Sequence, residues 1–169
     1  MSDQAKKDQL RLGFLTAVED PERGYVGGLL VTNRYGRPLE FQCTTPVKPN
    51  RTQQILYGPT LRPYLLSELI GKTLIEKVGV KPHLVLTEDE SLCELREHVD
   101  IPVGCFSDES SATLRIGNRH LEFHSSHASE MDHVRDQCKD VPTSADLKEP
   151  FDRIREALQE TMKAALNRS

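Results

Sequence analysis

Hydrophobic and polar positions alternate along the first part of the chain in the manner of β-strands. Apolar residues recur at every second position over residues 10–18, which predicts a strand with one buried face. Residues 25–32 are almost entirely apolar or glycine, which favours a central strand buried on both faces. Residues 39–44 alternate again, and the sequence from Asn33 to Gly36 suits the turn between them. The pattern therefore predicts three leading antiparallel strands.

The middle of the chain changes from a strand period to a helix period. Two adjacent apolar rows over residues 61–78 predict a long helix, with Thr60 as its N-cap and Gly79 at its end. Short apolar runs at 83–87 and 101–106 flank a predicted helix that begins at the acidic residues 88–90. A strand, a helix and a strand with short links indicate a βαβ crossover and parallel pairing.

The last third of the chain divides into three segments. Residues 113–124 form a predicted hairpin around Gly117 and Asn118. Residues 125–149 are polar and rich in Ser, Asp and His, and an amphipathic helix is predicted from about residue 150. We therefore expect a single α/β domain over 1–124, a polar linker over 125–149, and a C-terminal helix over 150–169 that packs on the domain or on a partner.

The predicted fold class is α/β with a mixed sheet. It has three leading antiparallel strands, a long helix, a βαβ crossover, an added hairpin and a C-terminal helix. By analogy alone, this order resembles the ribonuclease H-like fold. The resemblance implies a nuclease site in which carboxylates from the first strand, the first helix and the end of the fourth strand hold two divalent ions. The counterparts here are Glu19, Glu68 and Asp89, and only Asp89 is well placed. Convergence of the three carboxylates in the structure would support an enzyme, and their separation would argue against one.

Composition narrows the functional classes. The net charge is −4 and the pI is about 5.9, which gives no global attraction to nucleic acid or to an anionic membrane. The N-terminus is polar and no apolar run is long enough to span a bilayer, so we expect a cytoplasmic protein without membrane contact. The four cysteines are widely spaced, which predicts free thiols, with Cys138 the more accessible.

One candidate metal site lies in the second hairpin. His120, Glu122 and His124 alternate along one strand, so their side chains project to the same face and could converge on zinc or another divalent ion. Further candidate ligands follow soon after: His127, Glu130, His133 and Cys138. No spacing matches a standard zinc signature. The alternative is a polar, solvent-facing strand in a protein without a cofactor.

A second candidate is a local cluster of positive charge in the opening segment. Basic residues of the turn, the connector and the helix start are predicted to bind an anion, a nucleic acid or a protein partner. They are Arg34, Arg37, Lys48, Arg51 and Arg62. Between the first and the last of these, Glu40 is the only acidic residue. The alternative is that these side chains are simply solvated.

No sequence motif indicates catalysis. The chain lacks the nucleophile-elbow, zinc-protease, phosphate-loop and dinucleotide signatures, so an enzyme is not the favoured interpretation. The apolar stripe of the C-terminal helix favours a protein partner or a homo-oligomer. The sequence thus predicts a non-catalytic accessory or scaffold protein that acts through protein–protein interaction. The alternative is a nucleic-acid-associated or metal-dependent hydrolase of ribonuclease H-like fold.

Overall fold

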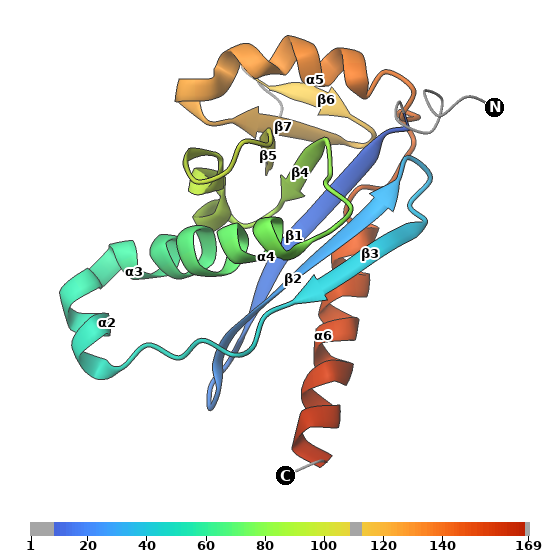
Figure 1. Cartoon of the computed structure of the whole chain (residues 1–169). Coiled ribbons are helices and arrows are strands. Elements are labelled where there is room, and N and C mark those ends of the chain that lie inside the picture. Colours follow the sequence, from blue (N-terminus) through green and yellow to red (C-terminus); the bar gives the residue numbers. More distant parts are fainter. Residues whose placement is uncertain (1–8, 109–112, 168–169) are drawn as a thin grey trace.

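A seven-stranded mixed sheet forms the centre of the molecule, with the strand order β3-β2-β1-β4-β5-β7-β6 (Figure 1). The computed structural model describes residues 9–108 and 113–167. The polar residues 1–8, on which the expected lack of an export signal rests, lie outside the described residues. The strands are β1 (Arg11–Asp20), β2 (Gly24–Asn33), β3 (Pro38–Cys43), β4 (Leu84–Thr87), β5 (Val103–Ser107), β6 (Leu114–Ile116) and β7 (Arg119–Phe123).

The strand pairing confirms the predicted fold class. β1, β2 and β3 pair antiparallel, whereas β4 pairs parallel with both β1 and β5. β6 and β7 form the predicted hairpin, with Ile116 opposite Arg119 and Leu114 opposite Leu121. Gly36 and Gly117 have positive φ angles, so each predicted turn has glycine where the backbone requires it. Three antiparallel strands followed by two parallel strands give the ribonuclease H-like arrangement, to which the second hairpin adds an edge.

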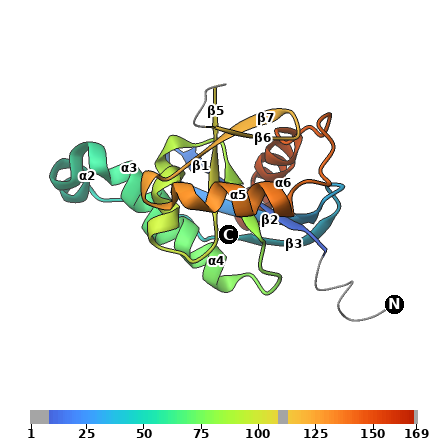
Figure 2. The same ribbon diagram turned by 90° about the horizontal axis from the view of Figure 1, so that it is seen from above.

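Helices cover both faces of the sheet (Figure 2). The helical segments are α2 (Arg51–Tyr57), η1 (Gly58–Thr60), α3 (Leu61–Pro63), η2 (Tyr64–Gly71), α4 (Lys72–Lys77), η3 (Glu90–Glu97), η4 (Ser125–Glu130), α5 (Met131–Gln137) and α6 (Glu149–Asn167). One core cluster joins η2, α4 and η3 to the sheet, and the other joins α5 and α6 to the opposite face. Alternation along β1 explains this division, because Phe14 belongs to the α6 side and Leu15 to the η2 side.

The long helix differs from its prediction in where it begins. Thr60 directly precedes α3 but its side chain does not cap it, since the hydroxyl donates to the Tyr57 carbonyl at 2.6 Å. The first helical turn is α2, which starts after Asn50 with a capping box: Gln53 N–H donates to Asn50 Oδ1 at 2.8 Å, and Asn50 N–H donates to Gln53 Oε1 at 3.0 Å. An Asn followed three residues later by Gln is a known start signal. α2 through α3 thus form an arm, residues 50–63, that projects from the body (Figure 1).

The C-terminal third of the described chain packs against the sheet. Phe151, Ile154 and Leu158 of α6 are buried at 1% exposure or less. The segment 125–149, predicted as a polar linker, also contributes buried Val134 and Cys138. Within the described residues, no helix is long and apolar enough to cross a membrane.

Two of the four cysteines are not the free thiols that the sequence predicts. Cys93 on η3 and Cys105 on β5 form a disulfide, whereas Cys43 and Cys138 are free. Cys138 is also not accessible, because only 5% of it is exposed. Burial raises the pKa of the Cys138 thiol to about 12, so little reactive thiolate is present at neutral pH.

Alkylation should distinguish these three environments. We expect iodoacetamide at pH 8 to add one group to the native protein, at Cys43, because the Cys138 thiol is buried and protonated. Denaturation without reductant should expose the second free thiol, and denaturation with reductant should add the two from the disulfide. Intact mass spectrometry counts the adducts. Four adducts on the denatured, unreduced chain would contradict the disulfide.

Candidate functional site

An open depression of about 500 Å³ lies where β4 ends, beside Thr16 and Ala17 of β1. Its lining residues come from β1, α3, the segment after β4, and α6: Thr16, Ala17, Arg62, Glu88, Asp89, Glu90, Ser91 and Arg155. β1 and β4 are parallel neighbours, with Phe14 paired to Leu86, so the carboxyl end of β4 reaches the depression beside the second half of β1. In open α/β sheets, ligands characteristically bind outside the carboxyl ends of such strands.

One wall of the depression is a bidentate ion pair between Arg62 and Asp89. Arg62 Nη1 donates to Asp89 Oδ1 at 2.6 Å and Nη2 donates to Oδ2 at 2.8 Å. Nη1 also donates to Ser91 Oγ at 2.9 Å. Asp89 itself is the N-cap of η3 and accepts from Ser91 N–H at 2.9 Å. These hydrogen bonds to the Asp89 carboxylate raise the pKa of Arg62 above its ordinary value.

A second ion pair forms the opposite wall, between Glu88 and Arg155. The Glu88 carboxylate contacts Arg155 of α6, whose Nη1 also donates to Asp152 at 3.1 Å. Glu88 and Asp89 are consecutive, so one faces the α6 side and the other the α3 side. Thr16 lies on β1 beside Glu88 and is only 3% exposed. The depression thus combines a buried hydroxyl with two arginines that are each held by a carboxylate.

Glu19 extends the charged network along the end of β1. It stands opposite Tyr25 in the β1–β2 ladder. Burial, followed by the Glu19 carboxylate, raises the pKa of Tyr25, while Arg62 opposes that effect. Tyr25 therefore remains a neutral phenol between an anion and a cation, and it links Glu19 to the Arg62–Asp89 pair.

The carboxylates do not fit the divalent-metal set that the fold implies. Glu68 of η2 instead pairs with His98, with 3.6 Å between Oε1 and Nε2. The first strand offers Thr16 rather than a carboxylate beside Glu88, and Asp89 is occupied by Arg62. In the part of the chain that the structure describes, no group of three or more His, Cys, Asp or Glu side chains could hold a metal ion. The convergence of Glu19, Glu68 and Asp89 that would support a metal-dependent enzyme is not found.

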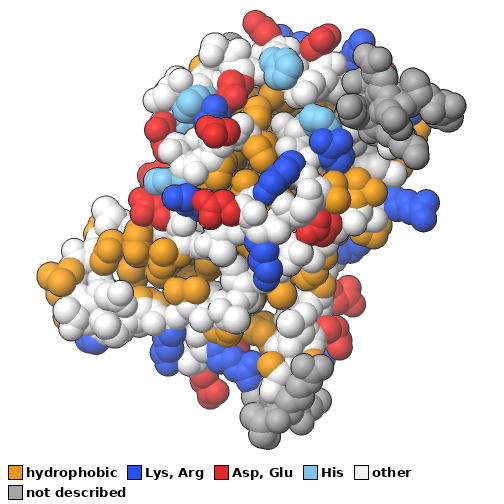
Figure 3. Space-filling view, in the orientation of Figure 1, with side chains coloured by type: hydrophobic (Ala, Val, Ile, Leu, Met, Phe, Trp, Pro, Cys, Tyr) orange, Lys and Arg blue, Asp and Glu red, His pale blue; other side chains and the backbone are white. Residues whose placement is uncertain are grey.

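The arm lies beside this depression, and its surface combines exposed hydrophobic side chains with an absence of acidic ones. Residues 41–67 contain no acidic side chain. Ile55 and Leu56 at the end of α2 are 63% and 77% exposed. Tyr57 stacks on Tyr64 with 4.7 Å between the ring centroids. Hydrophobic side chains accordingly gather along the projecting limb in the space-filling view (Figure 3). Sequence periodicity missed this surface because it indicated no helix before Thr60.

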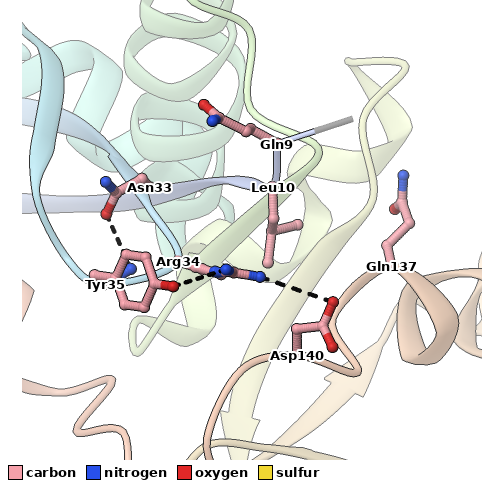
Figure 4. Close-up of a pocket in the computed structure, with 7 residues that line it drawn as sticks. All are labelled: Gln9, Leu10, Asn33, Arg34, Tyr35, Gln137 and Asp140. Carbon is pink, nitrogen blue, oxygen red and sulfur yellow. Dashed lines mark hydrogen bonds and ion pairs between the residues drawn. The ribbon is translucent and has the colours of Figure 1, made fainter. Parts of the chain in front are cut away.

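The predicted cluster of basic residues is divided between the two ends of β2. Lys48 lies near the Gly24 end, where its Nζ donates to the Glu22 carbonyl at 2.8 Å. Arg34 and Arg37 follow the Asn33 end, which is roughly 30 Å away for a strand of this length. There Arg34 contacts the Tyr35 hydroxyl and, at 3.8 Å, Asp140 (Figure 4).

The arm side therefore retains three of the predicted basic residues: Lys48, Arg51 and Arg62. Arg62 is the one that reaches the depression. The binding role of the basic residues stays a prediction, but the five do not form one surface.

The predicted metal ligands of the second hairpin also lie in different settings. β7 ends at Phe123, so the alternation that would align His124 with His120 does not continue. His120 Nδ1 lies 3.4 Å from Thr113 Oγ1, whereas His124 Nδ1 lies 3.1 Å from Glu97 Oε1 on η3. No metal-holding group is found among the described residues. Zinc binding by His120, Glu122 and His124 remains a prediction that this geometry does not support.

The sheet order and the position of the depression define a protein of the ribonuclease H-like fold class. Among solved structures, the chain resembles human endonuclease V, with 12% identity, a TM-score of 0.49, and coverage of 91% of this chain and 86% of that chain. It also resembles Ciona intestinalis endonuclease V in complex with an inosine-containing 23mer DNA, with 9% identity, a TM-score of 0.45, and coverage of 92% and 88%. No protein-family model and no curated protein matches the sequence.

These similar structures correct one prediction. The sequence favoured a non-catalytic scaffold that acts through protein–protein interaction, but the structures with this arrangement are endonucleases, two of them bound to DNA. At these identities and TM-scores the resemblance concerns the fold, and the role of particular residues rests on the geometry of this chain.

Proposed function

We propose that this protein is nucleic-acid-associated and that it contacts the phosphate backbone with the arm and with the depression at the end of β4. The observation that carries the proposal is that both surfaces meet at Arg62. This residue belongs to α3 of the arm, and its guanidinium lines the depression beside Asp89. A nucleic-acid strand that follows the arm would therefore pass over the carboxyl end of β4.

The arm has the chemistry that a nucleic-acid surface needs. It is free of acidic side chains and carries the exposed Arg51. Exposed Ile55 and Leu56 can pack on or between bases, as apolar side chains of nucleic-acid-binding proteins commonly do. The stacked pair Tyr57 and Tyr64 supplies aromatic surface next to them. Neutral donors and acceptors are supplied by the Asn and Gln residues of α2 and its cap.

The charge balance sets the expected strength of binding. The whole chain has a net charge of −4, so attraction must be local to the arm. With about three phosphate contacts, the logarithm of the affinity should fall with the logarithm of salt concentration at a slope of about −2 to −3. Binding should therefore be measurable at low salt and weak at physiological salt.

Substitution of Arg51 should show how much the arm contributes to nucleic-acid binding. We expect Arg51→Ala to weaken binding several-fold and to reduce the magnitude of the salt slope by about one, because one phosphate contact is lost. Fluorescence anisotropy with labelled single-stranded DNA, duplex DNA and RNA, between 50 and 200 mM KCl, measures both quantities. Electrophoresis of the same incubated strands reports any cleavage.

The matched control is Arg135→Ala. Arg135 is also an exposed arginine, but it lies on α5, away from the arm (Figure 1). We expect this variant to bind as the native protein does. Lack of binding to all three nucleic acids at 50 mM KCl would overturn the proposal. An equal loss in both variants would show only diffuse attraction and would overturn the assignment to the arm.

A further inference from the structure

The depression at the end of β4 contains paired charges where a metal-dependent site would need free carboxylates. Arg62 binds Asp89 in the fork geometry, and Arg155 contacts Glu88. Glu90 also borders the depression and is exposed. Two cations thus face three anions, so an incoming phosphate meets carboxylates that compete for the same guanidinium groups.

We propose that Arg62 and Arg155 bind a phosphate of the nucleic-acid backbone at this site without a divalent ion. The phosphate replaces the carboxylates of Asp89 and Glu88 as the partner of the two guanidinium groups. This inference rests on the proposed nucleic-acid function and specifies its chemistry. Arginine suits the exchange, because its planar fork binds a carboxylate and a phosphate in the same bidentate geometry.

Accessibility supports the exchange at Arg62. Its side chain is 45% exposed although it makes three hydrogen bonds to Asp89 and Ser91. Asp89, by contrast, is fixed, because its carboxylate also caps η3 through Ser91 N–H. The guanidinium is therefore the mobile partner, and it can turn toward a ligand in the depression while Asp89 keeps its place at the helix start.

The side chains around the depression do not favour a metal ion that would join the protein to the phosphate. A two-metal site needs several carboxylates to be free at one place. Here Thr16 lies next to Glu88, Glu68 is paired with His98, and among the described residues no suitable group of metal ligands exists. Glu88 and Asp89 consequently act as competitors of the phosphate, which reverses the expected effect of removing them.

The Asp89→Asn variant tests this reversal. Asparagine retains the shape and capping capacity of Asp89 but loses the charge that holds Arg62. We expect nucleic acid to bind about fivefold more tightly, which corresponds to the ~1 kcal/mol of a partly exposed ion pair. Glu88→Gln should act in the same direction through Arg155. Anisotropy is measured once in EDTA and once in Mn²⁺, and the two affinities of the native protein should agree.

Asp132→Asn serves as the control, because Asp132 pairs with Arg135 on α5, outside the depression. Its affinity should equal that of the native protein. If the native protein binds nucleic acid only with Mn²⁺, or if Asp89→Asn weakens binding, the metal-free exchange is wrong while the proposed function stands. If the native protein binds no nucleic acid under either condition, the proposed function fails and this inference fails with it. Thermal melting of each variant confirms that it is folded.

Discussion

Replacement of Phe151 by alanine should lower the free energy of unfolding by about 3–5 kcal/mol, because it leaves a large cavity in the core. Phe151 is fully buried at the start of α6. Its ring meets Phe14 of β1 and Phe106 of β5 edge-on, at centroid distances of 5.5 and 5.4 Å. One side chain thus fixes α6 to two strands of the sheet. Urea denaturation followed by circular dichroism measures the loss.

Met162→Ala provides the comparison within the same helix. Met162 is only partly buried against the same core cluster, so its truncation should cost about 1 kcal/mol. If α6 were a detachable arm, both variants would lose little. A loss of less than about 1 kcal/mol for Phe151→Ala would contradict the packing of α6 and, with it, the position of Arg155 over Glu88.

Strand alternation predicted most of the sheet because it is a local property. The period of two in β1, the apolar run of β2 and the glycine turns at Gly36 and Gly117 each depend on a few neighbouring residues. The hairpin register followed directly from its turn. The crossover from β4 to β5 followed from the short links. Local pattern was therefore sufficient for fold class.

The site was harder to predict because its contacts join distant segments. Arg155 reaches Glu88 only after α6 has docked on the sheet, and Arg62 reaches Asp89 across the η2 and β4 segments. From the sequence, Asp89 was a candidate metal-binding carboxylate and Arg62 an anion-binding candidate. Neither pattern indicates that the two side chains bind each other.

Proximity in sequence was also misleading where the chain reverses. Arg34 and Arg37 are near Lys48 in sequence, but β3 and the segment that follows it run back beside β2 between them. Cys93 and Cys105 are separated by 12 residues, and their disulfide requires η3 to lie beside β5. No local period encodes either relation. Residues that bind one another through tertiary packing are thus the part of the site that a single sequence does not specify.

Replacement of Gly27 by alanine should destabilise the protein by about 1–3 kcal/mol through overpacking. The pair of glycines in β2 lies between helices on both faces of the sheet. A Cβ on Gly27 would overlap Ile70 of η2 and lie 3.3 Å from Leu74, while one on Gly28 would lie 2.8 Å from Ile154 of α6. Gly27 has a negative φ, so the cost is steric and does not arise from backbone strain. Urea denaturation provides the measurement.

A double-mutant cycle isolates the cause. In an Ile70→Ala background, the overlapping atom is absent, so Gly27→Ala should cost little and the coupling energy should be about 1–2 kcal/mol. Gly79→Ala is the control, since its nearest neighbour would be the flexible Glu40 carboxylate at 3.4 Å. Equal costs of Gly27→Ala in both backgrounds would contradict the close approach of η2. That approach matters for the site, because η2 continues directly from α3 and thereby sets where Arg62 meets Asp89.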